Sequence, residues 1–263
     1  AAEPYNHHQL IVSTTHQLLR FKQAFDLLII DEVDAFPYID DASLHYAVRK
    51  AVHPEGKLVY LTATPNDELQ KQIQAEKLIV TTLPARYHGH GLAEPVFQWI
   101  GNWRAQILDR KVNSHLYRQI CQFLTIEGAK LLFIPDIRLA KHLHEWLKSR
   151  NPHFSIECVH SKDPQRKEKV QQLRDGKLEG LISTTILERG VTFTNCHVFI
   201  IGAENRLFTS SSLVQMSGRV GRRPNFPIGV LIYGHEGISR NMLQARKEIK
   251  TMNRLARKRG LIQ

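Results

Sequence analysis

The second half of the chain alternates short apolar runs with amphipathic stretches, and this alternation constrains the fold more than any other feature. Five apolar runs follow one another, at residues 130–135, 154–159, 180–185, 197–202 and 228–233. Mainly helix-like stretches separate them; the first carries Leu139, Leu143, Trp146 and Leu147 on one face, and the second opens at Asp163-Pro164. Strands that alternate with helices predict an α/β fold, in which helices cover a parallel sheet.

Residues 25–37 join another apolar run to a cluster of acids. Residues 27–30 read Leu-Leu-Ile-Ile, typical of a strand buried on both faces, and Asp31, Glu32 and Asp34 follow directly. Ligands bind at the carboxyl edge of open parallel sheets. Because clustered acids repel one another, we expect a cation there, and a hydrated Mg²⁺ carried by a nucleotide fits. The alternative is a solvated acidic turn.

Two neighbouring stretches end in hydroxyl residues. Residues 9–15 predict a short strand that ends in Ser13, Thr14 and Thr15. Hydroxyls at a strand end suit phosphate contacts, although the same residues often cap a helix. Residues 57–61 predict a strand that runs into Thr62-Ala63-Thr64-Pro65.

Weaker patterns complete the first half. Residues 42–52 have helical spacing, and we expect this helix to end near Gly56. A second helix could begin after a cap at Asn66 or Asp67. Residues 78–82 look like a strand. The glycines and prolines of residues 84–95 are typical of a linker. We therefore predict a first domain at 1–84, a linker at 85–98 and a second domain at 99–263.

Charge is divided unevenly between the two halves. Residues 1–98 contain 8 Lys and Arg against 12 Asp and Glu, whereas residues 99–263 contain 28 against 13. A basic half indicates a polyanionic partner, although a generally basic solvated surface is the alternative. Residues 238–263 alone contain 8 basic residues and one acid, with a helical apolar stripe of Met242, Ile249, Met252 and Ala256.

Several other classes of protein and site are disfavoured. No run approaches the roughly 18 apolar residues of a membrane span, and the start has no signal-peptide pattern. Cys121, Cys158 and Cys196 lie far apart, which favours buried thiols in a reducing compartment over zinc ligands. His88 and His90 lie in a glycine-containing loop, and a metal-binding role is disfavoured for them.

Residues 215–223, Gln-Met-Ser-Gly-Arg-Val-Gly-Arg-Arg, suggest an anion site. On a helix, Arg219 and Arg222 would share a face and reach one anion together. The alternative is an exposed basic helix, but Gly218 and Gly221 argue against an ordinary helix because each costs roughly 1 kcal/mol relative to alanine.

Five segments together resemble, in order and spacing, motifs Ib, II, III, V and VI of superfamily 2 helicases. They are residues 13–15, 31–34, 62–64, 184–190 and 215–222. The sequence Ile-Ile-Asp-Glu-Val-Asp-Ala-Phe-Pro, preceded by Ser-Thr-Thr-His-Gln-Leu-Leu-Arg-Phe, is most similar to the ComFA family of late-competence helicase-like ATPases. The resemblance implies two RecA-like parallel-sheet lobes, the first of them incomplete.

The resemblance also implies roles for single residues, with ATP and Mg²⁺ as cofactors. Asp31 would hold the metal and Glu32 would be the general base. Thr62, Ala63, Thr64 and Gln215 would couple the nucleotide site to DNA; Gly190, Gln215, Arg219 and Arg222 would contact nucleotide, the two arginines as catalytic fingers. Ser13, Thr14, Thr15, Thr184, Thr185 and Arg189 would bind strand phosphates.

One departure from the family is large. The sequence contains no Gly-x-x-x-x-Gly-Lys-Ser/Thr loop and no four-cysteine zinc module, so we expect a carboxyl-terminal piece that is inactive by itself. The family implies single-stranded DNA, a membrane DNA channel and a ComFC-like protein as partners, in the cytoplasm or at the inner face of the membrane. A primosomal-restart-type helicase and a non-catalytic DNA- or partner-binding module are the alternatives.

Overall fold

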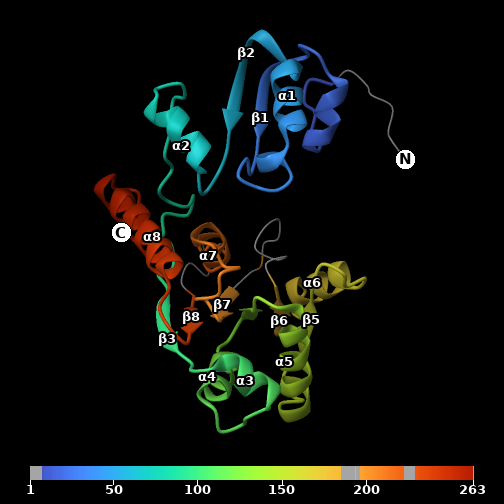
Figure 1. The fold of residues 1–263 in the computed structure, drawn as a ribbon, viewed down its shortest axis with the longest axis vertical. Helices are drawn as coiled ribbons and strands as arrows, with labels where there is room; N and C mark the ends of the chain where they lie inside the picture. The colour runs from blue at the N-terminus through green and yellow to red at the C-terminus, as the bar shows by residue number, and fades with distance from the viewer. Residues whose placement is uncertain (1–7, 185–192, 194–195, 222–228, 263) are drawn as a thin grey trace. The chain divides into compact units, whose positions relative to one another are not determined.

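The fold was analysed in a computed structural model that describes residues 8–184, 193, 196–221 and 229–262. It divides into two compact units, Ala1–Thr81 (unit 1) and Thr82–Gln263 (unit 2), whose elements are labelled in Figure 1. Both units contain a parallel sheet with helices, so the α/β class predicted from the sequence is confirmed.

Unit 1 is built on two parallel strands, β1 (Phe25–Ile30) and β2 (Val52–Tyr60). Helix α1 (Ala42–Ala51) connects them, and it begins where the Asp41 carboxylate accepts hydrogen bonds from the backbone of the first turn. Its residues Leu44, Ala47 and Val48 form a buried core with one face of the sheet. The short 3₁₀ helices η1 (Thr15–Arg20) and η2 (Tyr38–Asp40) add Leu18 and Tyr38 to this core. Helix α2 (Asp67–Gln74) follows, capped by Asn66 as predicted.

The opposite face of the β1–β2 sheet is exposed. Leu27 and Ile29 are 55% and 53% exposed, and Val59 and Leu61 beside them are 38% and 46% exposed. Within the described residues β1 pairs with β2 alone. The expectation that residues 27–30 are buried on both faces is therefore wrong, because no second layer covers the sheet in the described part of the chain.

Three local predictions for unit 1 also differ from the structure. Residues 9–14 and 78–82 are not strands, since neither segment has a neighbouring strand, among the residues described, to complete its backbone hydrogen bonds. Gly56 does not end a helix, because α1 stops at Ala51 and Gly56 lies inside β2. A side chain there would meet the Phe25 carbonyl at 2.8 Å, where the register of the two strands shifts.

Unit 2 contains a six-stranded parallel sheet of order β3-β8-β7-β4-β6-β5. The strands are β3 (Val96–Trp99), β4 (Ala129–Phe133), β5 (Ile156–Val159), β6 (Gly180–Ser183), β7 (Cys196–Ile201) and β8 (Leu231–His235). All five apolar runs predicted in this half contain strands. Strand β3 begins inside the stretch predicted as a linker, so that stretch contributes an edge strand to the sheet.

Helices cover both faces of this sheet (Figure 1). On one face pack α3 (Trp103–Leu108), α4 (His115–Leu124) and α5 (Ile137–Arg150). On the other pack α6 (Arg166–Arg174), α7 (Ser210–Ser217) and α8 (Arg240–Lys258). Helix α5 buries Leu143, Trp146 and Leu147 as its spacing predicted, and β7 is buried along its whole length. Helix α6 begins at Arg166, later than Asp163-Pro164 suggested.

The last helix, α8, differs in one position from its predicted stripe. Met242, Ile249 and Ala256 are buried as expected, but Asn253 is buried at 3% exposure and Met252 only partly. The Asn253 side chain accepts a hydrogen bond from the Leu92 amide at 2.7 Å and donates one to the Leu92 carbonyl at 2.9 Å. A polar residue thus takes a core position because it satisfies the backbone of the segment that enters unit 2.

Two further observations concern cysteines and membranes. All three cysteines are free thiols, and Cys158 and Cys196 are buried. Burial raises the pKa of the Cys158 thiol to about 11, so this thiol is protonated at neutral pH. Among the described helices, none combines the length and apolar character needed to cross a bilayer.

Candidate functional site

The acidic residues lie where β1 ends. Asp31 and Glu32 are both exposed immediately after the buried Ile30. The Glu32 amide donates a hydrogen bond to Asp31 Oδ1 at 2.9 Å. Glu32 has a φ of 52°, a left-handed conformation that costs a residue with a side chain roughly 1 kcal/mol. The chain therefore turns sharply at the carboxyl edge of the sheet and presents two carboxylates there.

Asp34 joins this acidic turn to residues 62–64. Its Oδ1 accepts a hydrogen bond from the Thr62 hydroxyl at 2.8 Å, and its Oδ2 accepts one from the Thr64 hydroxyl at 2.9 Å. The backbone supports the same contact, because the Val33 amide donates to the Leu61 carbonyl at 3.2 Å. The segments that resemble motifs II and III are thus tied together by one carboxylate.

This turn also fits the requirements of a magnesium–nucleotide complex. Magnesium in nucleotide sites needs one or two protein carboxylates, while phosphate oxygens and water supply the remaining ligands. Asp31 and Glu32 are exposed carboxylates on adjacent residues. No group of three or more metal-ligating side chains is present among the described residues, so the carboxylates would act with ligands that the nucleotide brings.

The hydroxyl residues before η1 are accessible. Ser13 and Thr14 are exposed, and Ser13 donates to the neighbouring Thr14 carbonyl at 3.3 Å. Thr14 precedes η1, yet its side chain makes no capping hydrogen bond. Capping therefore does not account for the Thr14 hydroxyl, and it stays a candidate phosphate contact together with Ser13 and Thr15.

The arginine-bearing segment of unit 2 is a turn and not a helix. Helix α7 ends at Ser217, and residues 218–221 form a turn in which Gly221 has a φ of 66°. The prediction that Arg219 lies on a helix face is wrong, because Gly218 ends the helix. Arg219 is 2% exposed. Gln215 lies on α7 and is partly buried.

The remaining predicted residues of unit 2 are only partly covered by the structure. Thr184 directly follows β6 and is partly exposed; the Ser183 hydroxyl donates to its carbonyl at 3.0 Å. Thr185, Arg189, Gly190 and Arg222 lie outside the described residues. Their roles stay predictions.

Two residues of the entering segment contact the 218–221 turn, and sequence patterns did not assign them to it. Arg86 Nη1 donates to the carbonyls of Val220 and Gly221, and His88 Nε2 donates to the Gly221 carbonyl at 3.1 Å. Burial, followed by the positive charge of Arg86, lowers the pKa of His88. The one sequence feature that could have pointed to this contact is that Arg86 is a charged residue inside a stretch rich in glycine and proline.

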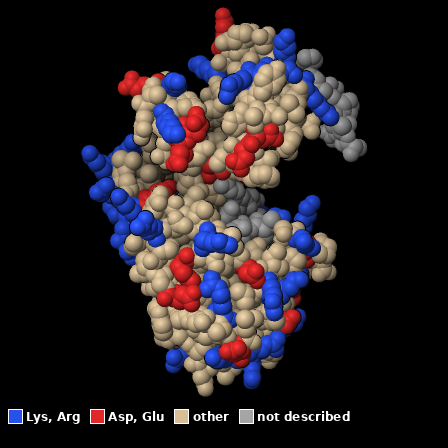
Figure 2. Space-filling view, viewed as in Figure 1, with Lys and Arg blue, Asp and Glu red and all other residues tan. Residues whose placement is uncertain are grey.

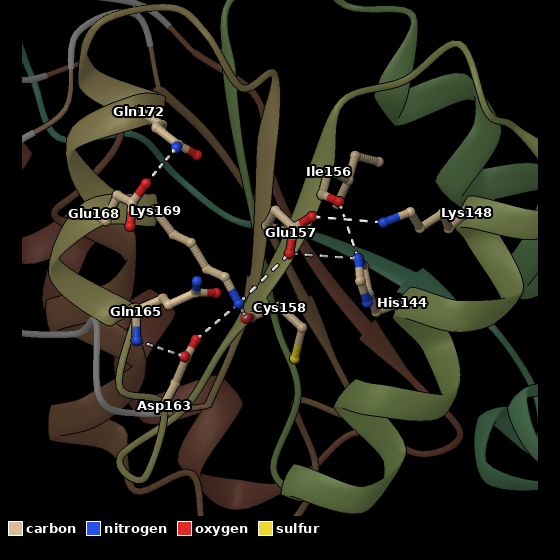
Figure 3. Close-up of polar contacts among 10 residues, drawn as sticks. All are labelled: His144, Lys148, Ile156, Glu157, Cys158, Asp163, Gln165, Glu168, Lys169 and Gln172. Carbon is tan, nitrogen blue, oxygen red and sulfur yellow. Dashed lines mark hydrogen bonds and ion pairs between the residues drawn. The ribbon is translucent and has the colours of Figure 1, made fainter.

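A network of charged groups surrounds β5 at the edge of the sheet (Figure 3). Lys169 of α6 contacts Asp163 at 3.0 Å and Glu157 at 3.5 Å, while Lys148 of α5 approaches Glu157 from the other side at 3.8 Å. Burial opposes ionisation of Asp163, but hydrogen bonds from Lys169 and from the Gln165 amide outweigh it and hold its pKa below the usual value. The network fixes the loop that follows β5.

Helix α8 gathers basic side chains on its solvent face. Figure 2 shows Lys and Arg concentrated along the left side, where α8 lies in Figure 1. A groove on this face is lined by residues that recur at i, i+3 and i+4 along the helix, namely Leu243, Arg246, Lys247, Lys250, Thr251 and Arg254. Arg246 stacks over Phe97 of β3 at 4.1 Å from the ring centre. These basic side chains, called the basic stripe of α8, therefore have a fixed position on unit 2.

Comparison with known proteins gives consistent matches. The family described as helicase conserved C-terminal domain matches residues 115–224. The chain is 46% identical to the competence protein ComFA of Bacillus subtilis over 250 residues, covering 95% of this chain and 53% of the relative. It is 43% identical to ComFA of Streptococcus pneumoniae over 255 residues, covering 97% and 59%. The chain thus spans little more than half the length of these relatives.

A solved structure shows the same fold at low sequence identity. The structure of Saccharomyces cerevisiae Dbp5 bound to RNA and ADP BeF₃ has a TM-score of 0.61 and 17% identity. The match covers 90% of this chain and 60% of Dbp5. This structural match and the parallel sheets of both units support the RecA-like architecture that the motifs predicted.

Proposed function

Because the chain belongs to the ComFA family of superfamily 2 helicase-like proteins, we propose that it is the motor portion of an ATP-dependent translocase. We propose that the whole protein moves single-stranded DNA during DNA uptake in competence. The observation that carries the proposal is the pair of hydrogen bonds from Thr62 and Thr64 to Asp34. A change at the acidic turn would reach residues 62–64 through this one carboxylate.

In unit 1 the proposed roles follow from exposure and position. Asp31 would hold a magnesium ion, which when bound would neutralise phosphate charge in the transition state. Glu32 would accept a proton from the attacking water, for which an accessible carboxylate is suited. Thr62, Ala63 and Thr64 would couple the nucleotide site at this turn to the bound DNA. Ser13, Thr14 and Thr15 would donate hydrogen bonds to phosphates of the DNA strand.

In unit 2 the proposed roles belong to the segments after β6 and α7. Arg219 and Arg222 would stabilise negative charge on the nucleotide, since the guanidinium fork matches phosphate oxygens. Gly190 and Gln215 would contribute to the nucleotide side of this site. Thr184, Thr185 and Arg189 would hold strand phosphates.

The proposed substrate is selected by charge and strandedness. Contacts to phosphates carry no sequence information, so base order should matter little. The basic stripe on α8, together with the excess of Lys and Arg in residues 99–263, supports a polyanionic partner. The partners in the uptake machinery, a membrane DNA channel and a ComFC-like protein, are proposed from the family alone.

A second function is favoured for residues 1–263 taken by themselves. They contain no phosphate-binding loop of the Gly-x-x-x-x-Gly-Lys-Ser/Thr type, so they lack the lysine and backbone cradle that bind nucleotide phosphates tightly. We propose that these residues alone bind DNA without steady ATP hydrolysis.

The other alternative, a restart-type helicase, would differ from a single-strand translocase in its substrate. It should prefer forked DNA over single-stranded DNA.

The experiment that tests the proposed function uses Glu32→Gln in a longer ComFA chain that contains the phosphate-binding loop. The amide is isosteric but cannot accept a proton, so ATP hydrolysis should fall roughly 10²- to 10⁴-fold while ATP binding is retained. Asp26→Asn, an exposed acid within β1, is the matched control and should hydrolyse normally. Near-normal turnover by Glu32→Gln would remove Glu32 from the proposed site.

A further inference from the structure

We propose that Arg86 is a positioning residue that holds the 218–221 turn and thereby sets the direction of the Arg219 side chain. The proposal deepens the proposed function, since it rests on Arg219 acting in a nucleotide site. Arg86 lies in the segment by which the chain enters unit 2, well before the sheet begins. Nothing in the five helicase-like motifs assigns it a role.

The contact consists of one side chain and three backbone carbonyls. Arg86 Nη1 donates to the carbonyl of Val220 at 2.5 Å and to that of Gly221, and Nη2 donates to the carbonyl of Gly218 at 3.3 Å. His88 adds a fourth hydrogen bond, to the same Gly221 carbonyl. Arg86 therefore binds the carbonyl of the residue before Arg219, Gly218, and the carbonyls of the two residues after it, Val220 and Gly221.

The chemistry of the turn explains why an arginine suits this place. Helix α7 ends at Ser217, and carbonyls at and beyond a helix carboxyl end lack partners within the helix and carry partial negative charge. Val220 and Gly221 are buried, where an unpaired carbonyl is costly. The planar guanidinium offers several donors in a fixed fork and stays charged, whereas the three donors of a lysine ammonium all lie on one nitrogen and cannot span separate carbonyls in the same way.

Arg86 is itself held on unit 2 at both ends of its segment. Ahead of it, Arg259 donates to the Thr82 carbonyl at 2.6 Å. After it, the Gly89 amide donates to the Arg86 carbonyl at 3.0 Å, and Asn253 of α8 forms its two hydrogen bonds with the backbone of Leu92. The guanidinium therefore belongs to a fixed segment and can fix the turn in its place.

The consequence concerns Arg219 more than the overall fold. Its flanking carbonyls, those of Gly218 and Val220, are both bound by Arg86. With Arg86 removed, the turn would lose the three hydrogen bonds to the carbonyls of Gly218, Val220 and Gly221. The backbone hydrogen bonds that tie the turn to α7 and the bond from His88 would remain, so the turn would loosen without unfolding. A catalytic group displaced by about 1 Å can lose roughly 10²-fold in rate, so loosening this turn should lower turnover without removing nucleotide binding.

The first test follows backbone amide hydrogen exchange in residues 1–263 carrying Arg86→Ala, Arg86→Lys or the control Arg110→Ala. Arg110 is an exposed arginine whose partner Glu145 lies 3.0 Å away on the surface. Because Arg86→Ala removes three hydrogen bonds from a charged donor, amides of residues 218–221 should exchange at least about tenfold faster in this variant. Arg86→Lys should rescue little, and the amides of β7 and β8 should exchange as before in all variants. Unchanged exchange at 218–221 in Arg86→Ala would overturn the proposal.

The second test measures ATP hydrolysis in a longer ComFA chain that contains the phosphate-binding loop. Arg86→Ala should lower kcat by about tenfold or more and change the KM for ATP less than about twofold. Added guanidinium ion should restore part of kcat, which a general loss of folding would not allow. Faster exchange with unchanged kcat would contradict the positioning role. Failure of the unaltered longer chain to hydrolyse ATP would instead refute the proposed function, and the exchange result would still decide whether Arg86 holds the turn.

Discussion

The two units use the same kind of strand in very different surroundings. Residues 27–30 of β1 and residues 198–201 of β7 are both unbroken apolar runs. Strand β7 lies between β4 and β8 and is fully buried, because helices cover both faces of a six-stranded sheet. In β1 the alternate residues Leu27 and Ile29 are more than half exposed. An apolar run therefore shows what a strand can bury, while neighbouring elements decide what it does bury.

The same contrast applies to the chemistry of the units. The acidic turn of unit 1 follows a strand of a two-stranded sheet that is covered on one face only. The arginine-bearing turn and the basic helix α8 of unit 2 belong to a six-stranded sheet with helices on both faces. Since burial of apolar surface is the main stabilising term in folding, unit 2 should be the more stable of the two. Unfolding experiments can measure this difference.

The largest effect should appear in the unfolding of residues 1–263. All three tryptophans, Trp99, Trp103 and Trp146, belong to unit 2, so tryptophan fluorescence reports this unit alone while circular dichroism reports both. We expect circular dichroism to show an earlier loss of structure in urea, at concentrations where the fluorescence is still native. Coincident transitions by both probes would contradict the difference in stability.

Matched core variants sharpen that experiment. Leu44 of unit 1 and Leu132 of unit 2 are buried at 1% and 0% exposure, and leucine-to-alanine changes in cores cost roughly 2–5 kcal/mol. Leu44→Ala should shift only the early transition, and Leu132→Ala only the late one. A shift of both transitions by either variant would mean that the units unfold together.

A smaller effect is expected from the ion pair beside β5. The pKa of Asp163 is lowered, so its contribution to stability is present above the usual aspartate pKa and is lost as the pH falls through the lower folded value. The pKa of Lys169 is raised, because its bonds to Asp163 and Glu157 outweigh the opposing effect of burial. The Lys169 contribution is therefore complete below the usual lysine pKa and is lost only at strongly alkaline pH. Across neutral pH the pair should contribute a constant amount.

Asp163→Asn tests this pair. With side chains 8% and 18% exposed, the loss in the unfolding free energy of unit 2 at pH 7 should be about 2 kcal/mol, and it should diminish below about pH 4. Asp109→Asn is the control, because its pair with Lys111 is more than half exposed and should contribute at most about 0.5 kcal/mol. Equal effects of the two variants in urea unfolding would contradict the special place of Asp163.

The smallest effect concerns the basic face of α8. Lys247→Gln with Lys258→Gln removes two charges from α8, and Lys71→Gln with Lys77→Gln removes two charges from unit 1. If α8 binds DNA, the first pair should reduce the salt dependence of single-strand binding by up to ~0.7 for each phosphate that is no longer neutralised. Binding titrations at several salt concentrations measure this slope. Equal slopes for the two double variants would mean that the face is merely solvated.

Much of unit 2 was predictable from the sequence because local pattern and tertiary environment agree there. Its apolar runs became strands, and the stripe of α5 became a buried face. Residues 9–15 and 78–82 have similar β-branched composition but no strand beside them in the described part of the chain, so their composition alone misled the prediction. Strand formation depends on a partner, and a sequence read in short windows does not show the partner.

The candidate site was predictable in its residue types and less so in its contacts. Motif spacing indicated the acidic turn and residues 62–64, but only the structure shows the hydrogen bonds that Thr62 and Thr64 donate to Asp34. Arg86 and Asn253 make their contacts across more than 100 residues of sequence. Hydrophobic periodicity does not detect such polar residues, since their burial depends on backbone groups supplied by distant segments.

The most direct measurement of the central proposal compares ATP hydrolysis with and without single-stranded DNA. A longer ComFA chain with a phosphate-binding loop should hydrolyse ATP in the presence of Mg²⁺, faster when single-stranded DNA is added. Residues 1–263 alone should bind DNA, bind ATP weakly in calorimetry and show no steady hydrolysis. Steady hydrolysis with micromolar ATP binding by residues 1–263, or a longer chain whose hydrolysis ignores DNA, would contradict the proposed motor.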